Sequence, residues 1–281
     1  KDYVIASDTD SIYLHMGDLV EAVYKGREAT TEGIVSFLNK VCEMELEPYI
    51  ESSYQELAEY VNAYDQKMIM KRENIADRGI WTAKKRYILN VWDSEGVRYE
   101  QAKLKIMGIE AIKTSTPAPC RTMLKDAFKL LMTGTEDEVI DYIEKCRSEF
   151  KNFPPEEVGF PRSVNNLQKY KGVSDIYNKG TPINVRGALL FNHYIKKNNL
   201  EHKYSAIQNG EKIRFCYLKT PNWMHENVIS YIQDLPKELD LHKHVDYDLQ
   251  FEKAFLEPIK VILNCIGWET ERKNTLESFF S

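Results

Sequence analysis

The segment Tyr3-Val4-Ile5-Ala6-Ser7-Asp8-Thr9-Asp10-Ser11-Ile12-Tyr13-Leu14 indicates the fold class of the first part of the chain. Two short runs of strand-forming residues stand on either side of Ser7–Asp10, where turn-favouring residues gather. This pattern predicts a β-hairpin. The hairpin places Asp8 and Asp10 at its tip, where neighbouring side chains converge.

Farther along, the pattern alternates between helix and strand. A helical stretch with Thr31 as its N-cap is expected to bend or break at Pro48 and to resume as far as Val61. From 68 to 109 the chain is rich in strand formers, and 93–96 reads as a turn between two strands. Basic residues concentrate on this predicted hairpin.

The second part is predicted to be mostly helical, so the fold class is α+β. A capping-box pattern at Thr135 begins one of its helices, and the region 153–181 is rich in loop-forming residues. The predicted helices cover 117–134, 135–150, 185–197, 226–235 and 246–264, the last with a bend at Pro258.

Composition limits the classes of protein that fit. The 281 residues are 43% hydrophobic and 29% charged, which is typical of one or two globular domains. No apolar run is long enough for a transmembrane helix. The odd count of five widely spaced cysteines favours reduced thiols, and the histidines lack metal-finger spacing. The start is neither a secretory signal nor an initiator methionine, so we expect a processed chain or part of a longer one.

The net charge of −5 hides an asymmetry. Between Lys67 and Lys113 the chain carries eleven Lys and Arg against six Asp and Glu, a local net charge of +5. Such a block can form an anion-binding face, and it can equally be the solvated surface of a sheet.

The aspartate pair suits hard cations. Magnesium takes oxygen ligands and leaves positions for phosphate oxygens and water, and two-metal sites use carboxylates for phosphoryl transfer. The alternative is that Asp8 and Asp10 satisfy backbone donors of the turn.

Three motifs occur in a characteristic order. The string Ile5–Tyr13 resembles the Y-G-D-T-D-S signature of family B DNA polymerases, and Lys84-Lys85-Arg86-Tyr87 matches the K-K-R-Y element of that family. The stretch from Lys105 to Pro117 resembles the passage from palm to thumb. The sequence is most similar to the replicative polymerases of T-even-type bacteriophages, which implies the cytoplasm of an infected bacterial host.

The resemblance implies a partial palm, with β-hairpins packed on long helices, followed by a mostly helical thumb. On this interpretation residues 1–112 are the C-terminal part of the palm and 113–268 are the thumb. Residues 269–281 would be a flexible clamp-binding tail.

The resemblance also implies roles for individual acidic residues. Asp10 aligns with the aspartate most firmly tied to metal binding, Asp8 is its neighbouring carboxylate, and Glu73 aligns with an acidic residue near the site. The implied cofactor is Mg²⁺ in a two-metal site that this chain holds only in part. Glu73 has a plainer alternative, a strand-surface glutamate paired with Arg72 or Lys71.

DNA-binding roles follow in the same way. Lys85 and Tyr87 are implied to contact the minor groove of the primer–template terminus, and strand alternation would put them on one side, with Lys84 and Arg86 on the other. The remaining DNA-binding candidates, in the order of the chain, are Lys105, Lys113, Arg162, Asn166 and Lys169.

The C-terminal residues Leu276, Phe279 and Phe280 resemble a sliding-clamp-binding peptide, with Lys273 where many such peptides have Gln. The alternative is that this tail packs back on the thumb. The implied partners are therefore primer–template DNA, a dNTP, a sliding clamp and the missing N-terminal polymerase portion, without a membrane.

Two departures from the family pattern stand out. Ala6 and Ser7 occupy the positions of Tyr and Gly in the signature. A second catalytic aspartate, a fingers helix and an exonuclease domain would all precede Lys1. We therefore expect a DNA polymerase fragment that is inactive alone, with a non-catalytic DNA-binding and clamp-tethering module as the alternative. A metal-dependent glycosyltransferase is disfavoured because no nucleotide-sugar-binding βαβ pattern precedes the carboxylates.

Overall fold

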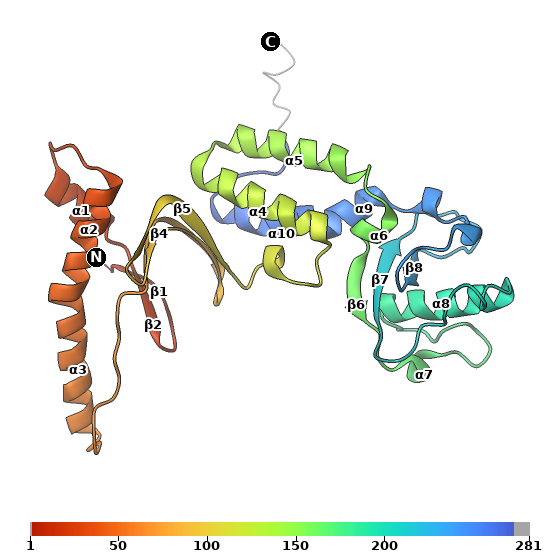
Figure 1. Ribbon diagram of the computed structural model, residues 1–281, viewed down its shortest axis with the longest axis horizontal. Helices are drawn as coiled ribbons and strands as arrows, with labels where there is room; N and C mark the ends of the chain where they lie inside the picture. Colours follow the sequence, from red (N-terminus) through yellow and green to blue (C-terminus); the bar gives the residue numbers. More distant parts are fainter. Residues whose placement is uncertain (1, 273–281) are drawn as a thin grey trace, which may run out of the picture. The chain divides into compact units, whose positions relative to one another are not determined.

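The chain divides into two compact units, Lys1–Met107 and Gly108–Ser281, and the computed structural model describes residues 2–272 of them (Figure 1). Each unit combines helices with antiparallel strands, so the predicted α+β class is confirmed. Among the described residues, no helix is both long and apolar enough to cross a membrane.

The first unit contains a two-stranded ribbon, β1–β2, and a three-stranded antiparallel sheet in the order β3-β4-β5. A long helical segment connects them. The elements are β1 (Val4–Asp8), β2 (Ser11–Leu14), α1 (Gly17–Tyr24), α2 (Thr31–Val41), the π-helical turn η1 (Cys42–Leu46), α3 (Glu47–Tyr60), β3 (Asn74–Ala83), β4 (Arg86–Ser94) and β5 (Val97–Met107).

The region predicted as one basic strand is two strands. β3 ends at Ala83, Lys84 and Lys85 form a two-residue turn, and β4 starts at Arg86. Lys85 has a left-handed φ of 61°. Lysine carries no strong turn preference, so nothing in the composition marked this reversal. The turn expected within 93–96 is confirmed, with positive φ at Glu95 and Gly96.

The chain was predicted to bend or break at Pro48, and a break does not occur. Helices α2 and α3 continue into one another through the π-helical turn η1, whose closing bond runs from the Glu47 amide to the Cys42 carbonyl oxygen. The helix begins one residue earlier than predicted, because the Thr30 hydroxyl accepts a hydrogen bond from the Gly33 amide. Helix α1 was not predicted.

The second unit combines a helical group with a three-stranded antiparallel sheet in the order β6-β7-β8. The elements are η2 (Glu110–Ile112), α4 (Ala118–Thr133), α5 (Glu136–Phe150), α6 (Pro155–Val158), β6 (Phe160–Ser163), α7 (Leu167–Tyr170), α8 (Ile183–Lys197), β7 (Lys212–Tyr217), β8 (Val228–Tyr231), η3 (Lys237–Leu239), η4 (His242–His244), α9 (Tyr247–Phe251), η5 (Glu252–Leu256) and α10 (Glu257–Cys265).

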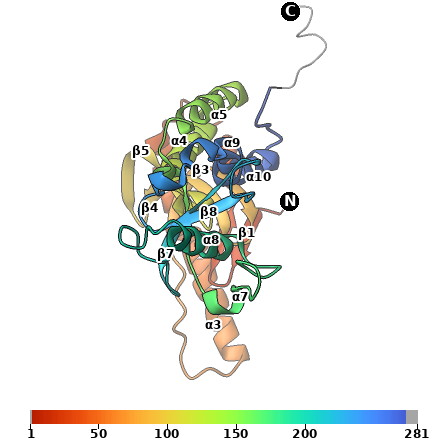
Figure 2. The same cartoon turned by 90° about the vertical axis from the view of Figure 1, so that its right-hand side faces the viewer.

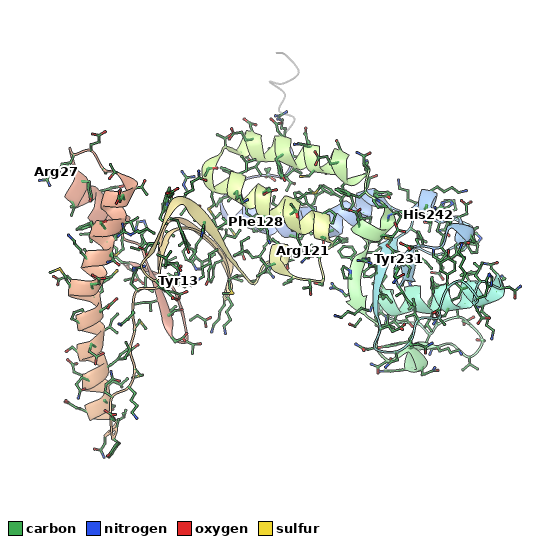
Figure 3. All side chains as sticks on the ribbon, in the orientation of Figure 1. Tyr13, Arg27, Arg121, Phe128, Tyr231 and His242 are labelled. Atoms are coloured by element: carbon green, nitrogen blue, oxygen red, sulfur yellow. The ribbon has the colours of Figure 1, made fainter. Side chains whose placement is uncertain are left out.

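Helix α8 covers the sheet of the second unit, packing on β8 and β7 (Figures 1 and 2). Gly187 makes this approach possible, since a Cβ there would lie 2.3 Å from the Ser230 hydroxyl oxygen. Phe128 in the helical group and Tyr231 in the sheet are fully buried (Figure 3). The core of this unit is thus built from both kinds of element.

The helix predicted over 226–235 is wrong, because that region contains strand β8. All four residues of β8 are buried, and a short, mostly apolar run fits a buried strand or a buried helix equally well. Strand β7 was also not predicted. The capping box is confirmed, with reciprocal hydrogen bonds between Thr135 and Glu138.

Candidate functional site

The tip of the β1–β2 ribbon is a two-residue turn, Thr9–Asp10, between the paired residues Asp8 and Ser11. The Asp10 amide and the Ser11 hydroxyl both donate to the Asp8 carbonyl oxygen, at 2.6 and 3.2 Å. The Asp8 carboxylate accepts from the Thr9 hydroxyl at 3.2 Å. Within the described residues, neither carboxylate accepts a backbone hydrogen bond, so both remain available to other partners.

Strand register decides which way Asp8 faces. Asp8 pairs with Ser11 and Ala6 pairs with Tyr13, and cross-strand partners lie on the same face of a ribbon. Asp8 and Tyr13 therefore share one face. The opposite face carries the paired residues Ser7 and Ile12, and the Ile12 side chain is exposed.

Asp8 meets the lysine turn. Its Oδ1 lies 3.8 Å from Lys84 Nζ and its Oδ2 lies 3.7 Å from Lys85 Nζ. The two lysine side chains are 76% and 67% exposed, so each pair contributes at most about 1 kcal/mol. The structure thus brings a predicted metal-binding carboxylate together with two predicted DNA-binding lysines.

The expected alternation of the K-K-R-Y element is not observed. Lys84 and Lys85 form the turn, and only Arg86 and Tyr87 belong to β4, so Lys85 and Tyr87 do not share a strand face. Tyr87 is 8% exposed and packs within the aromatic cluster of the sheet. The lysines, not the tyrosine, present the exposed surface of this element.

Tyr13 connects the ribbon to the sheet. Its ring centroid lies 5.3 Å from that of Trp81 on β3 and 5.5 Å from that of Tyr87 on β4, both edge-on. Burial raises the pKa of the Tyr13 hydroxyl, and a hydrogen bond with Tyr87 and the charges of Glu73 and Asp8 raise this pKa further. Tyr13 therefore stays protonated within electrostatic reach of both carboxylates.

Glu73 immediately precedes β3. Its carbonyl oxygen accepts a 2.6 Å hydrogen bond from the Glu95 amide, and its carboxylate pairs with Lys105 on β5. The hydrogen bond from Lys105 lowers the pKa of Glu73 below its ordinary value, although partial burial opposes the change. The ion-pair partner of the Glu73 carboxylate among the described residues is thus Lys105, a residue predicted to contact DNA, whereas Arg72 donates to the Glu73 carbonyl oxygen at 3.5 Å.

A second charged group lies next to Glu73, and the sequence did not reveal it. Asp93 has only 1% of its side chain exposed and is held by Arg72 and by Arg98 Nε at 2.8 Å. Arg72 also donates to the Asn39 side chain at 2.6 Å, and Arg98 donates to the Ser36 hydroxyl at 3.0 Å. This network joins helix α2 to the sheet. Only the three-dimensional pairing of distant segments identifies it.

The donor set of the ribbon turn fits magnesium in chemical type. Asp8 and Asp10 offer hard carboxylate oxygens, and magnesium is commonly held by one or two carboxylates together with substrate phosphates and water. Among the described residues, no cluster of three or more His, Cys, Asp or Glu side chains could hold a metal ion without further ligands. Asp8 and Asp10 would therefore hold such an ion only together with further ligands.

The candidates in the second unit lie apart from the ribbon in the sequence. Arg162 on β6, Asn166 at the start of α7 and Lys169 within α7 are all exposed. Asn166 has a left-handed φ of 59°. Lys113 is paired with Glu110 at 2.9 Å, so part of its charge is already neutralised.

The tail residues Leu276, Phe279 and Phe280 lie outside the described residues. Just before them, Glu271 pairs with Arg147 and Arg272 pairs with Asp141, both on helix α5. The segment that leads to the tail therefore contacts α5.

Comparison with known proteins gives matches that span nearly all of this chain and about a third of each relative. No protein-family profile matches the chain. The DNA-directed DNA polymerase of Escherichia phage RB69 is 33% identical over 99% of this chain and 32% of its own length. The DNA-directed DNA polymerase of Enterobacteria phage T4 is 28% identical over 100% of this chain, again covering 32% of its own length. The chain spans about a third of the curated relatives that it matches, and it corresponds to that portion of a T4-like phage DNA-directed DNA polymerase.

Proposed function

We propose that the chain supplies the metal-binding carboxylate turn, the lysine turn and the duplex-gripping unit of a family B DNA polymerase that extends a primer on a DNA template. The observation that carries this proposal is the meeting of Asp8 with Lys84 and Lys85. It places a carboxylate, which is a metal-ligand type, beside two exposed ammonium groups. The proposed reaction joins a nucleotide to a DNA primer, and both are polyanions that need positive charge near them.

Asp10 is proposed as the principal metal ligand and Asp8 as its neighbour. The Asp10 carboxylate has no hydrogen-bond or ion-pair partner within residues 2–272, whereas the Asp8 carboxylate faces two lysine ammonium groups and the Thr9 hydroxyl. Bound magnesium ions would activate the primer hydroxyl and stabilise the pyrophosphate leaving group. Glu73, fixed at its carbonyl oxygen and by Lys105, contributes negative charge to the same face of the sheet.

The proposed DNA contacts are made by basic side chains that are exposed to solvent. Lys84 and Lys85 can reach the minor-groove edge or the phosphates of the primer terminus, because their ammonium groups are on a turn. Arg162 and Lys169 are exposed without a carboxylate partner in the described part of the chain, which suits contacts to duplex phosphates.

Primer extension tests the proposal. The chain alone, with primed template, dNTPs and Mg²⁺, should not extend the primer, because its carboxylate set is incomplete. Adding the polypeptide that corresponds to the remaining two thirds of the relatives should restore extension. Asp10→Asn should then reduce the rate by more than about a hundredfold, since even changes next to metal ligands cost about 10–100-fold.

Asp65→Asn is the matched control. Asp65 is exposed, and its ion-pair partner among the described residues is Lys67 on a loop, so its removal should leave the restored rate unchanged. Normal extension by the complemented Asp10→Asn protein would refute the catalytic assignment. Robust extension by the chain alone would show that its ligand set is complete.

A non-catalytic module that binds DNA and tethers a sliding clamp is the second candidate. The partial carboxylate set favours it for the isolated chain. Replacing Phe279 and Phe280 by Ala should abolish binding to a sliding clamp without changing the unfolding curve. Unchanged clamp affinity would eliminate the tethering role.

A further inference from the structure

The two-stranded ribbon needs support from the rest of the first unit. A lone hairpin of two strands is marginally stable in water, and β1 and β2 pack extensively only on each other. Its carboxylates nevertheless have to keep a fixed position. Contacts with the three-stranded sheet must therefore determine the position of the turn.

The ion pairs at the tip are too weak for this task. Both lysine side chains are more than two-thirds exposed, and exposed pairs are screened by solvent and salt. An aspartate held only in this way would move with its flexible partners.

Tyr13 makes directional ring contacts with the sheet, which the exposed lysines do not. It lies on the same ribbon face as Asp8, and its ring is wedged edge-on against Trp81 and Tyr87. Trp81 is itself seated over Gly79, where a Cβ would come within 2.6 Å of the indole ring. Edge-to-face aromatic contacts of this kind are directional. The ring therefore fixes both the distance and the tilt of the ribbon.

We propose that Tyr13 is the positioning residue of the carboxylate turn, holding Asp8 in register with the Lys84–Lys85 turn through the Trp81–Tyr87 wedge. Tyr13 touches neither substrate nor metal in this assignment and acts through Asp8. Its importance for polymerisation rests on the proposed function, whereas the positioning itself does not.

The test uses the full chain with its lysines labelled by reductive ¹³C-methylation, which keeps their charge. Lys→Arg variants assign the Lys84 and Lys85 signals, and Asp8→Asn defines their unpaired positions. Tyr13→Ala should move both signals at least half of the way to the Asp8→Asn positions. Tyr13→Leu keeps apolar volume but loses the aromatic contacts, and it should move them in the same direction by a smaller amount.

Two controls separate positioning from loss of folding. Ile12→Ala removes an apolar side chain from the opposite face of the same strand and should leave both signals in place. Lys103, whose ammonium lies 4.0 Å from the Tyr99 ring centroid, reports the intact sheet through its ring-current shift. That shift should persist in Tyr13→Leu.

Wild-type Lys84 and Lys85 signals in folded Tyr13→Ala or Tyr13→Leu would overturn the proposal. So would loss of the Lys103 shift in both variants, because Tyr13 would then hold the sheet as a whole. The readout needs no DNA, metal or nucleotide. Its failure therefore leaves the polymerase proposal standing, and failed primer extension leaves this one standing.

Discussion

Asp93 shows how strongly one residue can hold the first unit together. Its carboxylate is almost completely buried and is shared by Arg72, Arg98 and the Gly96 amide. Removing one partner of a buried ion pair leaves the other charge uncompensated, which costs about 3–5 kcal/mol. We expect Asp93→Ala to lower the free energy of unfolding of the first unit by this amount. The measurement is urea denaturation, followed by spectroscopic signals of residues in β4.

The matched control is Asp65→Ala. The Asp65 side chain is 58% exposed, so this substitution should change stability by less than about 0.5 kcal/mol.

The pH dependence of stability gives a second check on Asp93. Burial raises the pKa of Asp93, but the hydrogen bonds from Gly96, Arg72 and Arg98 outweigh this effect and lower the pKa below its ordinary value of about 3.9. The stabilisation is therefore complete above about pH 4 and is lost as the pH falls through the lowered value. A wild-type advantage over Asp93→Ala that grew in acid would contradict this account.

Glu73 and Lys105 allow a direct measurement on the candidate site. The hydrogen bond from Lys105 is the main cause of the lowered pKa of Glu73. Lys105→Met should therefore raise the pKa of Glu73, as followed by ¹³C-carboxyl NMR titration. Lys103→Met, on the same face of the same strand, should leave it unchanged, because Lys103 lies over Tyr99. An unaltered Glu73 pKa in Lys105→Met would mean that another group holds the carboxylate.

Candidate residues that stand within a local motif could be selected from the sequence, whereas contacts between distant segments could not be predicted. Asp8, Asp10, Lys84 and Lys85 stand in short recognisable strings. The contact between Asp8 and the lysines joins two turns that lie far apart in the chain, so no local pattern encodes it. The role of Tyr13 depends on the same long-range packing.

At the scale of elements, two prolines produce the same irregularity. A proline inside a helix lacks an amide hydrogen and clashes with the carbonyl of the residue four positions earlier. Pro48 follows the π-helical turn η1 and Pro258 follows η5, at the same spacing. In both, the residue before the proline donates to the carbonyl five positions back. The π-helical turn accommodates the proline, so both helices continue past it, and the irregularity predicted at each proline takes the form of a π-helical turn.

Pro48→Ala tests this explanation. The substitution restores an amide donor and removes the clash, so η1 should convert to regular α-helix and the free energy of unfolding should rise by roughly 1 kcal/mol. Hydrogen exchange should show a protected amide at position 48. A persistent π-helical turn in the variant, seen in backbone chemical shifts, would show that tertiary packing and not the proline causes it.

The elements that the sequence predicted well carry local signals. The capping box at Thr135 and the turn at Glu95–Gly96 are defined by neighbouring residues, and both are observed. Strand β8 is different, because all four of its residues are buried and α8 packs on it, so its short and mostly apolar run has no diagnostic period. The turn at Lys84–Lys85 gave no signal for a related reason, since strand pairing and not residue preference sets it.

At the scale of the whole molecule, the net charge of −5 does not prevent binding to a polyanion, because cations are unevenly distributed and unevenly paired. Lys105 and Lys113 already face carboxylates, whereas Arg162 and Lys169 have no carboxylate partner within residues 2–272. Each cation that neutralises a phosphate releases counterions, so the unpaired cations should dominate the salt dependence of DNA binding.

This contrast leads to a quantitative prediction for duplex DNA. The logarithm of the binding constant should fall linearly with the logarithm of the salt concentration, by about 0.9 for each phosphate neutralised. Arg162→Ala with Lys169→Ala should therefore reduce the magnitude of the slope by about 2, measured by fluorescence anisotropy over a salt series. Lys113→Ala should reduce it by less, because the 2.9 Å pair with Glu110 must be given up on binding. Lys129→Ala, which removes a lysine paired with Asp126 on α4, is the control and should leave the slope unchanged. Equal losses for the paired and the unpaired cations would show that ion pairing within the chain does not govern its affinity for DNA.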